Sequence, residues 1–245
     1  MPTNTSMRER RAGGRVFVDL CLSSDSGVNP LSSGAVKQIR DTLRRLSADD
    51  TAHGLIIRAE GRCFCAGADV KEFRGFGLDD FRRYMTDILA MYAEMSEFPK
   101  PIVSLVHADA LGGGAALAFF SDLVIAVESA KFGLPEVHRG MAGGGYLMPR
   151  LVGKHRAAEM VLLGRSFGAS EMLAWGLVNQ VCPAVEIEAR AQALLEELAA
   201  LDVGAFAVAK ASLSGGLAVG MREAMDRHVT AQTKAFSRAR ATNTP

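Results

Sequence analysis

The sequence lacks an excess of either charge. Lys and Arg together number 28 and Asp and Glu number 27, which gives a formal net charge of +1. This balance argues against a dedicated nucleic-acid-binding protein, because such proteins usually carry a clear basic excess. The chain also lacks an uninterrupted apolar stretch of about 18 residues, the length typical of a transmembrane helix. We therefore expect neither a nucleic-acid partner nor a membrane span.

Cysteine is scarce as well, with four residues at positions 21, 63, 65 and 182. Their spacing contains no CxxC pair and no zinc-binding pattern, so we expect reduced thiols and no metal site. The polar start MPTNTSMRERRAGGR is followed by no apolar run, which is not the pattern of a secretory signal. These features together predict a cytoplasmic protein.

The apolar content is ample. Hydrophobic residues make up 49% of the 245 positions, enough to bury a large core in one domain. Strand patterns alternate with helical ones as far as about residue 182, which predicts an α/β core with parallel strand pairing. We expect a flexible tail over 1–14, the α/β core over 15–184 and a helical, oligomerising module over 185–245.

A run of three glycines lies between an expected strand and an expected apolar helix. The strand is 102–106, and Gly112, Gly113 and Gly114 open the helix over 112–120. Free N–H groups and the positive end of the helix dipole at such a place bind phosphate, carboxylate or a developing oxyanion. The alternative is that these glycines only allow close packing of the helix on the sheet.

Two further segments carry chemistry of the same kind. Small residues at 65–68 leave backbone amides uncovered, and Asp69 is placed to cap the turn that follows. Glu136 comes directly after Pro135 between apolar residues, which favours partial burial. Burial raises the pKa of a carboxyl group and suits it to shuttle protons near neutral pH. The alternative is a solvated surface glutamate.

In this order and spacing the segments resemble the crotonase superfamily, the enoyl-CoA hydratase/isomerase family. The matching stretches are FCAGADVKEF (64–73), KPIVSLVHADALGGG (100–114), SDLVIAVESAKFGLPEV (121–137) and LLGRSFGASEMLAWGLVNQV (162–181). The resemblance extends over about residues 15–240. It implies the crotonase fold, a spiral of β-β-α units followed by C-terminal helices, and assembly as trimers or dimers of trimers.

The resemblance also implies an acyl thioester substrate, on coenzyme A or an acyl carrier protein, with no further cofactor. The backbone N–H groups of Ala68 and Gly113 would hold the thioester oxygen and stabilise an enolate, with Glu136 as acid and base. Fatty acid or polyketide metabolism is the expected setting. The implied substrate-binding residues are Ala66, Ala68, Asp69, Val70, Lys71, Gly112 and Gly113.

One departure from the family bears on the reaction. Hydratases of the family carry a first glutamate three residues after the middle glycine, where this chain has Ala116, while the second is retained as Glu136. One base suffices for a 1,3-proton shift, whereas hydration normally benefits from two groups around one water. The pattern therefore favours double-bond isomerisation over hydration.

Three alternatives stay open. Decarboxylating relatives of polyketide β-branching bind the substrate carboxylate through residues matching Lys71 and His228, although they generally lack the glutamate kept here at 136. Ala116 keeps open a non-catalytic crotonase-fold binding subunit. Apart from these alternatives, His138 is close enough in sequence to Glu136 to tune the pKa of that glutamate.

The third alternative is of another class. Gly164 to Gly168 (GRSFG) matches the GxSxG nucleophile elbow of serine hydrolases, with Ser166 as nucleophile. Asp202 and His228 follow in the order of an α/β-hydrolase triad. The elbow needs a preceding strand, however, and the residues before it continue a helical pattern.

Overall fold

The computed structural model describes residues 3–216 and 219–242 and is built around a six-stranded sheet, with strand order β1-β2-β3-β4-β6-β9. All neighbouring pairs in it are parallel except the antiparallel β1–β2 pair. A second sheet has the order β5-β7-β8. The strands are β1 (Asn4–Ala12), β2 (Arg15–Ser23), β3 (Ala52–Ala59), β4 (Ile102–Val106), β5 (Ala110–Leu111), β6 (Leu123–Val127), β7 (Lys131–Gly133), β8 (Ser166–Gly168) and β9 (Gln180–Cys182).

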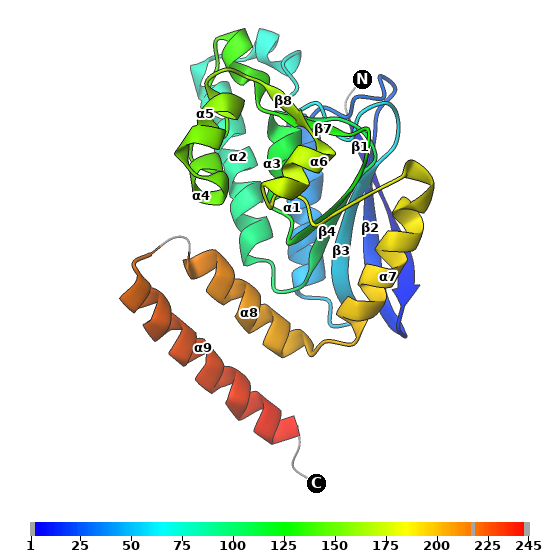
Figure 1. Cartoon of the computed structure of the whole chain (residues 1–245), viewed down its shortest axis with the longest axis vertical. Helices are drawn as coiled ribbons and strands as arrows, with labels where there is room; N and C mark the ends of the chain where they lie inside the picture. Colours follow the sequence, from blue (N-terminus) through cyan, green and yellow to red (C-terminus); the bar gives the residue numbers. More distant parts are fainter. Residues whose placement is uncertain (1–2, 217–218, 243–245) are drawn as a thin grey trace.

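Helices fill most of the connections between strands (Figure 1). The α-helices are α1 (Ser33–Ser47), α2 (Leu78–Glu97), α3 (Gly113–Phe119), α4 (Met148–Val152), α5 (Lys154–Val161), α6 (Ala169–Ala174), α7 (Ile187–Ala199), α8 (Val203–Gly216) and α9 (Met221–Thr242). Short 3-10 turns are η1 (Glu72–Gly75), η2 (Pro135–Arg139) and η3 (Ala184–Glu186). The strand expected over 102–106 is present as β4, and the helix expected over 112–120 is present as α3, one residue shorter at each end.

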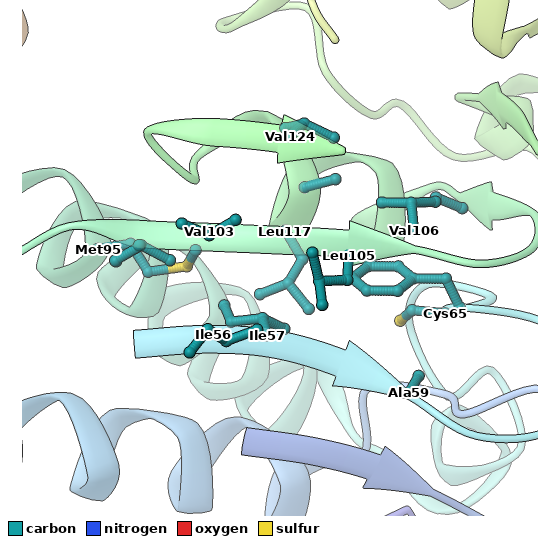
Figure 2. Packing of buried hydrophobic residues seen from close by; sticks show 14 of the residues in the cluster. Ile56, Ile57, Ala59, Cys65, Met95, Val103, Leu105, Val106, Leu117 and Val124 are labelled. Atoms are coloured by element: carbon teal, nitrogen blue, oxygen red, sulfur yellow. The ribbon is translucent and has the colours of Figure 1, made fainter. Parts of the chain in front are cut away.

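The core lies where β3 and β4 meet α3. Ile56 and Ile57 of β3 lie beside Val103 and Leu105 of β4, with Leu117 of α3 among them (Figure 2). These strands are buried on both faces, which explains why GLIIR and PIVSLV read as continuous apolar runs rather than alternating ones. Each such side chain contributes about 1.5–3 kcal/mol on burial. The four cysteines are also buried, as free thiols.

The prediction of a flexible tail over 1–14 is wrong. Residues 4–12 form β1, which pairs along its whole length with β2, from Asn4 opposite Ser23 to Ala12 opposite Arg15. The strand is at the edge of the sheet and is mostly exposed. Its side chains therefore show no apolar alternation, which is the signal that sequence reasoning relies on.

A buried carboxylate holds this edge strand in place. Asp19 on β2 is fully buried, and its oxygens accept hydrogen bonds from Arg8 Nε (2.8 Å) and from Arg10 Nε (3.0 Å) on β1. Arg10 and Arg58 also form ion pairs with Glu188 on α7, each within 2.9 Å. Burial alone would raise the pKa of Asp19, but the hydrogen bonds from Arg10 and Arg8 outweigh it, so its pKa is lowered.

The expected boundary at 184/185 between the α/β core and the C-terminal helical module does not match the packing of the helices. Helix α7 packs on the large sheet and buries Ile187, Ala191 and Leu195, so it belongs to the core. Helix α8 is fixed by Lys210, whose Nζ lies 2.7 Å from the Asp122 carboxylate beside β6. Helix α9 packs along α8 and extends away from the sheets (Figure 1).

Within the described ranges, no single helix is both long and apolar enough to cross a bilayer, and only one bent pair, 184–199 with 203–216, passes a test of length and composition.

The Asp19 cluster leads to a stability prediction. Replacing Asp19 by Ala should lower the free energy of unfolding by about 3 kcal/mol, because it leaves partly buried arginines without their partner. The folded-state pKa of Asp19 lies below its usual value of 3.8, so this stabilisation is present above the unfolded-state pKa and is lost as pH falls through the folded value. Urea unfolding at pH 7 and at about pH 3 measures both effects.

Asp41→Ala is the matched control, because Asp41 forms an exposed i,i+4 pair with Lys37. It should leave the urea midpoint unchanged. Equal effects of the two substitutions, or a loss for Asp19→Ala that persists undiminished in acid, would contradict the role assigned to the cluster.

Candidate active site

Two backbone turns touch at the carboxyl ends of β3 and β4. Gly67 has φ +84°, and a Cβ on it would lie 2.8 Å from Leu111 O and 2.9 Å from Gly113 N. A Cβ on Gly114 would overlap the Cys65 carbonyl oxygen. Only glycine permits this approach. The turns are joined by hydrogen bonds from Phe64 N to Asp109 O (3.0 Å) and from Leu111 N to Cys65 O (2.9 Å).

Two backbone N–H donors without an acceptor in the described part of the chain belong to residues that line the inner of two adjoining chambers. Neighbouring amides are used: Asp69 N donates to Leu31 O at 3.3 Å, and Gly112 N to Gly133 O at 2.8 Å. The amides of Ala68 and Gly113 have no acceptor among the described residues. Paired free donors of this kind bind an oxyanion. Asp69 caps the turn as expected, since its Oδ1 accepts from Lys71 N at 3.0 Å.

Glu136, in η2, places its carboxylate beside these donors. A Cβ on Gly112 would lie 2.8 Å from Glu136 Oε1, and one on Gly143 would lie 2.5 Å from the same oxygen. The carboxylate therefore sits between two glycines. Its Oε2 is buried without a hydrogen-bond partner in the described part of the chain. This desolvation raises the pKa of Glu136 above its usual 4.5.

The donors and the carboxylate stand where two chambers join. The outer chamber has a volume of about 700 Å³ and the inner one about 360 Å³. The outer chamber is lined by charged residues of both signs, with Arg62, Lys71 and Arg139 as the basic ones and Asp69, Glu72 and Glu136 as the acidic ones. The residues common to both are Ala68, Gly112, Glu136 and Met141.

The inner chamber is mainly apolar. Ala116 of α3 lines it, at the position where the resemblance implies a first glutamate in hydratases. Among the described residues that line this chamber, Glu136 is the single one with a carboxyl group. Sequence reasoning missed most of the remaining wall, which comes from one face of α2 and from the loop over 140–146. The apolar side chains that α2 contributes are Phe81, Met85, Ile88 and Leu89, and Phe73, Leu134 and Met141 add to them.

Most of the predicted site residues come together. The outer chamber is lined by Ala66, Ala68, Asp69, Val70, Lys71 and Gly112, and the inner one by Gly113. His228 does not join them. It lies on α9, where its Nδ1 is 2.8 Å from Ser212 Oγ in a separate hollow of about 190 Å³ between α8 and α9. Within one chain, Lys71 and His228 therefore share no cavity among those the described residues form.

The serine hydrolase alternative is wrong. Ser166 is the first residue of β8 and packs against Gly133, so no strand leads into it as a nucleophile elbow requires. Asp202 caps α8 by accepting from Ala205 N at 2.7 Å, and His228 is paired with Ser212. The three members of the supposed triad are thus occupied in different places.

His138, and also His107 at the end of β4, lie outside the two chambers. His138 is exposed, and its ring lies against Gly164; the cause of the raised Glu136 pKa is burial, with no part played by His138. His107 places Nε2 2.9 Å from Gly61 O and so ties the end of β4 to the first glycine of the neighbouring loop. Neither ring lines the two chambers.

A fold with two facing backbone donors and a buried carboxyl defines an enzyme class, and comparison with known proteins agrees. The family model for enoyl-CoA hydratase/isomerase matches residues 19–243. A probable mitochondrial enoyl-CoA hydratase of Dictyostelium discoideum is 33% identical over 222 residues, covering 89% of this chain and 78% of the relative. Mevalonyl-coenzyme A hydratase of Aspergillus fumigatus is 44% identical over 129 residues, covering 51% and 48%.

Solved structures agree as well. The crystal structure of an enoyl-CoA hydratase from Bacillus anthracis matches with a TM-score of 0.87 at 29% identity, covering 94% of this chain and 90% of that one. The chain belongs to the enoyl-CoA hydratase/isomerase family of the crotonase superfamily. The predicted fold class, a mixed α/β core with helices at the C-terminus, is confirmed.

The position of Glu136 between two glycines can be tested directly. Gly143→Ala should push the carboxylate toward the solvated outer chamber, because a Cβ there overlaps it, and so lower its pKa toward 4.5. Gly145→Ala is the matched control in the same loop, since a Cβ at Gly145 meets nothing within 4 Å. Carbon-13 NMR titration of the glutamate carboxyl groups measures the pKa. An unchanged Glu136 titration in Gly143→Ala would show that the glycine does not set its burial.

Proposed function

We propose that this chain moves protons beside the carbonyl of an enoyl thioester, with double-bond isomerisation as its principal reaction. The observation that carries the proposal is the placement of Glu136. Among the described residues that line the inner chamber it has the single carboxyl group, and it shares that chamber with Ala68 and Gly113, whose amides have no acceptor. One base and one oxyanion site are the minimum that a 1,3-proton shift requires.

In the proposed reaction Glu136 first accepts a proton and then returns it, while the Ala68 and Gly113 amides stabilise the intermediate. With the thioester oxygen held by the Ala68 and Gly113 amides, the Glu136 carboxylate takes a proton from C2 of a 3-enoyl thioester. The electron pair passes through the C3 double bond and the carbonyl to form a dienolate, whose negative charge the two N–H donors stabilise. Glu136 then returns the proton at C4, which leaves a 2-enoyl thioester and the carboxylate as it began.

The two chambers suit the two parts of such a substrate. Arg62, Lys71 and Arg139 at the outer chamber match the phosphates of coenzyme A. The apolar inner chamber matches an acyl group, which would gain about 0.8 kcal/mol for each buried methylene. We therefore favour coenzyme A over an acyl carrier protein as the carrier.

Hydration is the second candidate. It is supported by the names of two relatives, a probable enoyl-CoA hydratase and a mevalonyl-coenzyme A hydratase. Decarboxylation is less favoured, because His228 lies between α8 and α9 rather than beside Lys71.

The expected trimer or dimer of trimers stays a prediction. Exposed Met221, Met225 and Val229 on α9 support self-association through that helix.

Replacing Glu136 by Gln should lower turnover by at least about 100-fold, the usual scale for loss of a general base, without unfolding the chain.

In the wild type, kcat/KM should rise with pH through a pKa above 4.5, because the base is active only when deprotonated and burial raises its pKa. Mass spectrometry of 3-enoyl, 2-enoyl, 3-hydroxyacyl and glutaconyl thioesters in deuterated water records exchange, isomerisation, hydration and loss of carbon dioxide together. The absence of all four would favour the non-catalytic subunit.

A pair of substitutions isolates the Gly113 donor. Gly113→Pro removes the N–H, and Gly113→Ala adds a similar Cβ, 3.0 Å from the Tyr92 hydroxyl, while keeping the N–H. The proline variant should have a kcat about 100-fold or more below that of the alanine variant, the usual loss for one oxyanion donor. Circular dichroism checks that both variants fold. Equal kcat values would place the oxyanion site elsewhere.

A further inference from the structure

Helix α2 carries two buried tyrosines whose hydroxyl groups both donate to backbone carbonyls of other elements. Tyr84 donates to Leu31 O and Tyr92 donates to Gly113 O, each at 2.7 Å. Both residues are at most 4% exposed, and burial raises the pKa of both phenols, so each keeps its proton and acts as a donor. Gly113 carries one amide of the proposed oxyanion site, and Leu31 is paired with the residue that carries the other.

The Tyr92 hydroxyl holds the first turn of α3. Gly112, Gly113 and Gly114 have no side chains that could fix this turn, so contacts from other elements have to fix it. The hydroxyl lies so close that a Cβ on Gly113 would be 3.0 Å from it. The Tyr92 ring stacks on that of Phe120, the C-cap of α3, with ring centroids 4.8 Å apart. Tyr92 thus contacts both ends of this short helix.

The Tyr84 hydroxyl supports the other amide through one intermediate residue. Leu31 forms an isolated parallel bridge with Ala68. The Leu31 N–H donates to Gly67 O at 2.8 Å, and the Leu31 carbonyl oxygen accepts from Asp69 N at 3.3 Å as well as from Tyr84. The residues on either side of Ala68 are therefore held by Leu31, and Leu31 is held by Tyr84. Because the Gly67 carbonyl and the Ala68 N–H share one peptide group, the bond from Leu31 N also strengthens that N–H as a donor.

Both supports stand on one continuous element. Tyr84 and Tyr92 are eight residues apart on α2, which separates them by about 12 Å along the helix axis. They belong to the buried face of this helix, together with Ile88 and Met91. A helix positions functional groups more precisely than a loop does. Two hydroxyl groups on one helix can therefore fix the relative position of two turns that come from different parts of the chain.

We infer that Tyr84 and Tyr92 are positioning residues, through which helix α2 fixes the amides of the oxyanion site relative to one another. The inference rests on the proposed role of the Ala68 and Gly113 amides. Each phenol spends its proton on a backbone carbonyl and acts on the substrate through the amide that it holds. A displaced amide still admits the substrate, but it is poorly aligned with the oxygen on which charge develops, so the loss falls mainly on the transition state.

The test is a pair of substitutions, Tyr84→Phe and Tyr92→Phe, each of which removes one oxygen atom and keeps the ring. The probe is butyryl-CoA labelled with carbon-13 at the thioester carbonyl, and infrared difference spectroscopy records its carbonyl stretch on the enzyme. Hydrogen bonds from the two amides should lower this frequency in the wild type, and each variant should keep only part of the lowering. The kcat for exchange of the C2 protons in deuterated water should fall about 10-fold with KM nearly unchanged, because a donor is displaced rather than removed.

Ser104→Ala is the matched control, because it removes a fully buried hydroxyl in β4 whose partner, Ser121 Oγ at 2.8 Å, belongs to neither turn. It should lower the melting temperature as the tyrosine variants do, since a buried hydrogen bond is lost in each. It should keep the wild-type carbonyl frequency and the wild-type kcat. Thermal unfolding followed by circular dichroism compares the three variants, and if one tyrosine variant does not fold, the other tests the inference at its own amide.

A wild-type frequency and kcat in either folded tyrosine variant would overturn the inference and leave the proposed function standing. An equal change of frequency in Ser104→Ala would do the same, because it would assign the effect to lost stability. A wild type that does not lower the carbonyl frequency of the bound probe would overturn the proposed oxyanion site itself.

Discussion

The site depends on one steric constraint, the contact between two backbone turns that only glycine allows. Gly67 and Gly114 each lie where a side chain would overlap the opposite turn, and hydrogen bonds between 64–65 and 109–111 hold the turns together. Among the amides that these hydrogen bonds leave without an acceptor in the described residues, those of Ala68 and Gly113 belong to residues that line the same chamber. The oxyanion site is therefore a consequence of how β3 and β4 end, and no side chain has to move to form it.

The second requirement is a carboxyl group whose surroundings destabilise the ionised form. Glu136 lies against Gly112 on one side and Gly143 on the other, and its buried oxygen has no donor in the described part of the molecule. Burial without a compensating hydrogen bond costs free energy, and such costs are common where a group must exchange protons. The rigid parallel sheet and the buried cluster at β3, β4 and α3 provide the stability that offsets it.

Sequence reasoning found these elements because each leaves a local signal. The runs GLIIR and PIVSLV, the glycines at 112–114 and the Pro-Glu pair at 135–136 stand out in the chain. What it missed depends on partners distant in sequence. Strands β5, β7 and β8 are only two or three residues long and have no periodicity to read. Strand β1 is polar because it lies at the exposed edge of the sheet. It is held there by hydrogen bonds to Asp19, which is eleven residues away from Arg8 in the sequence. The chamber wall from α2, and Tyr146, become neighbours of Glu136 only in the fold.

The alanine at position 116 changes the electrostatics as well as the number of catalytic groups. Two carboxylates in one site repel each other, so that one keeps a proton because of the other. With Ala116 in place, desolvation is what raises the pKa of Glu136. The neutral side chain at 116 thus leaves burial as the main cause of the raised pKa, so a group that excludes solvent from the inner chamber would act on Glu136 in the same direction.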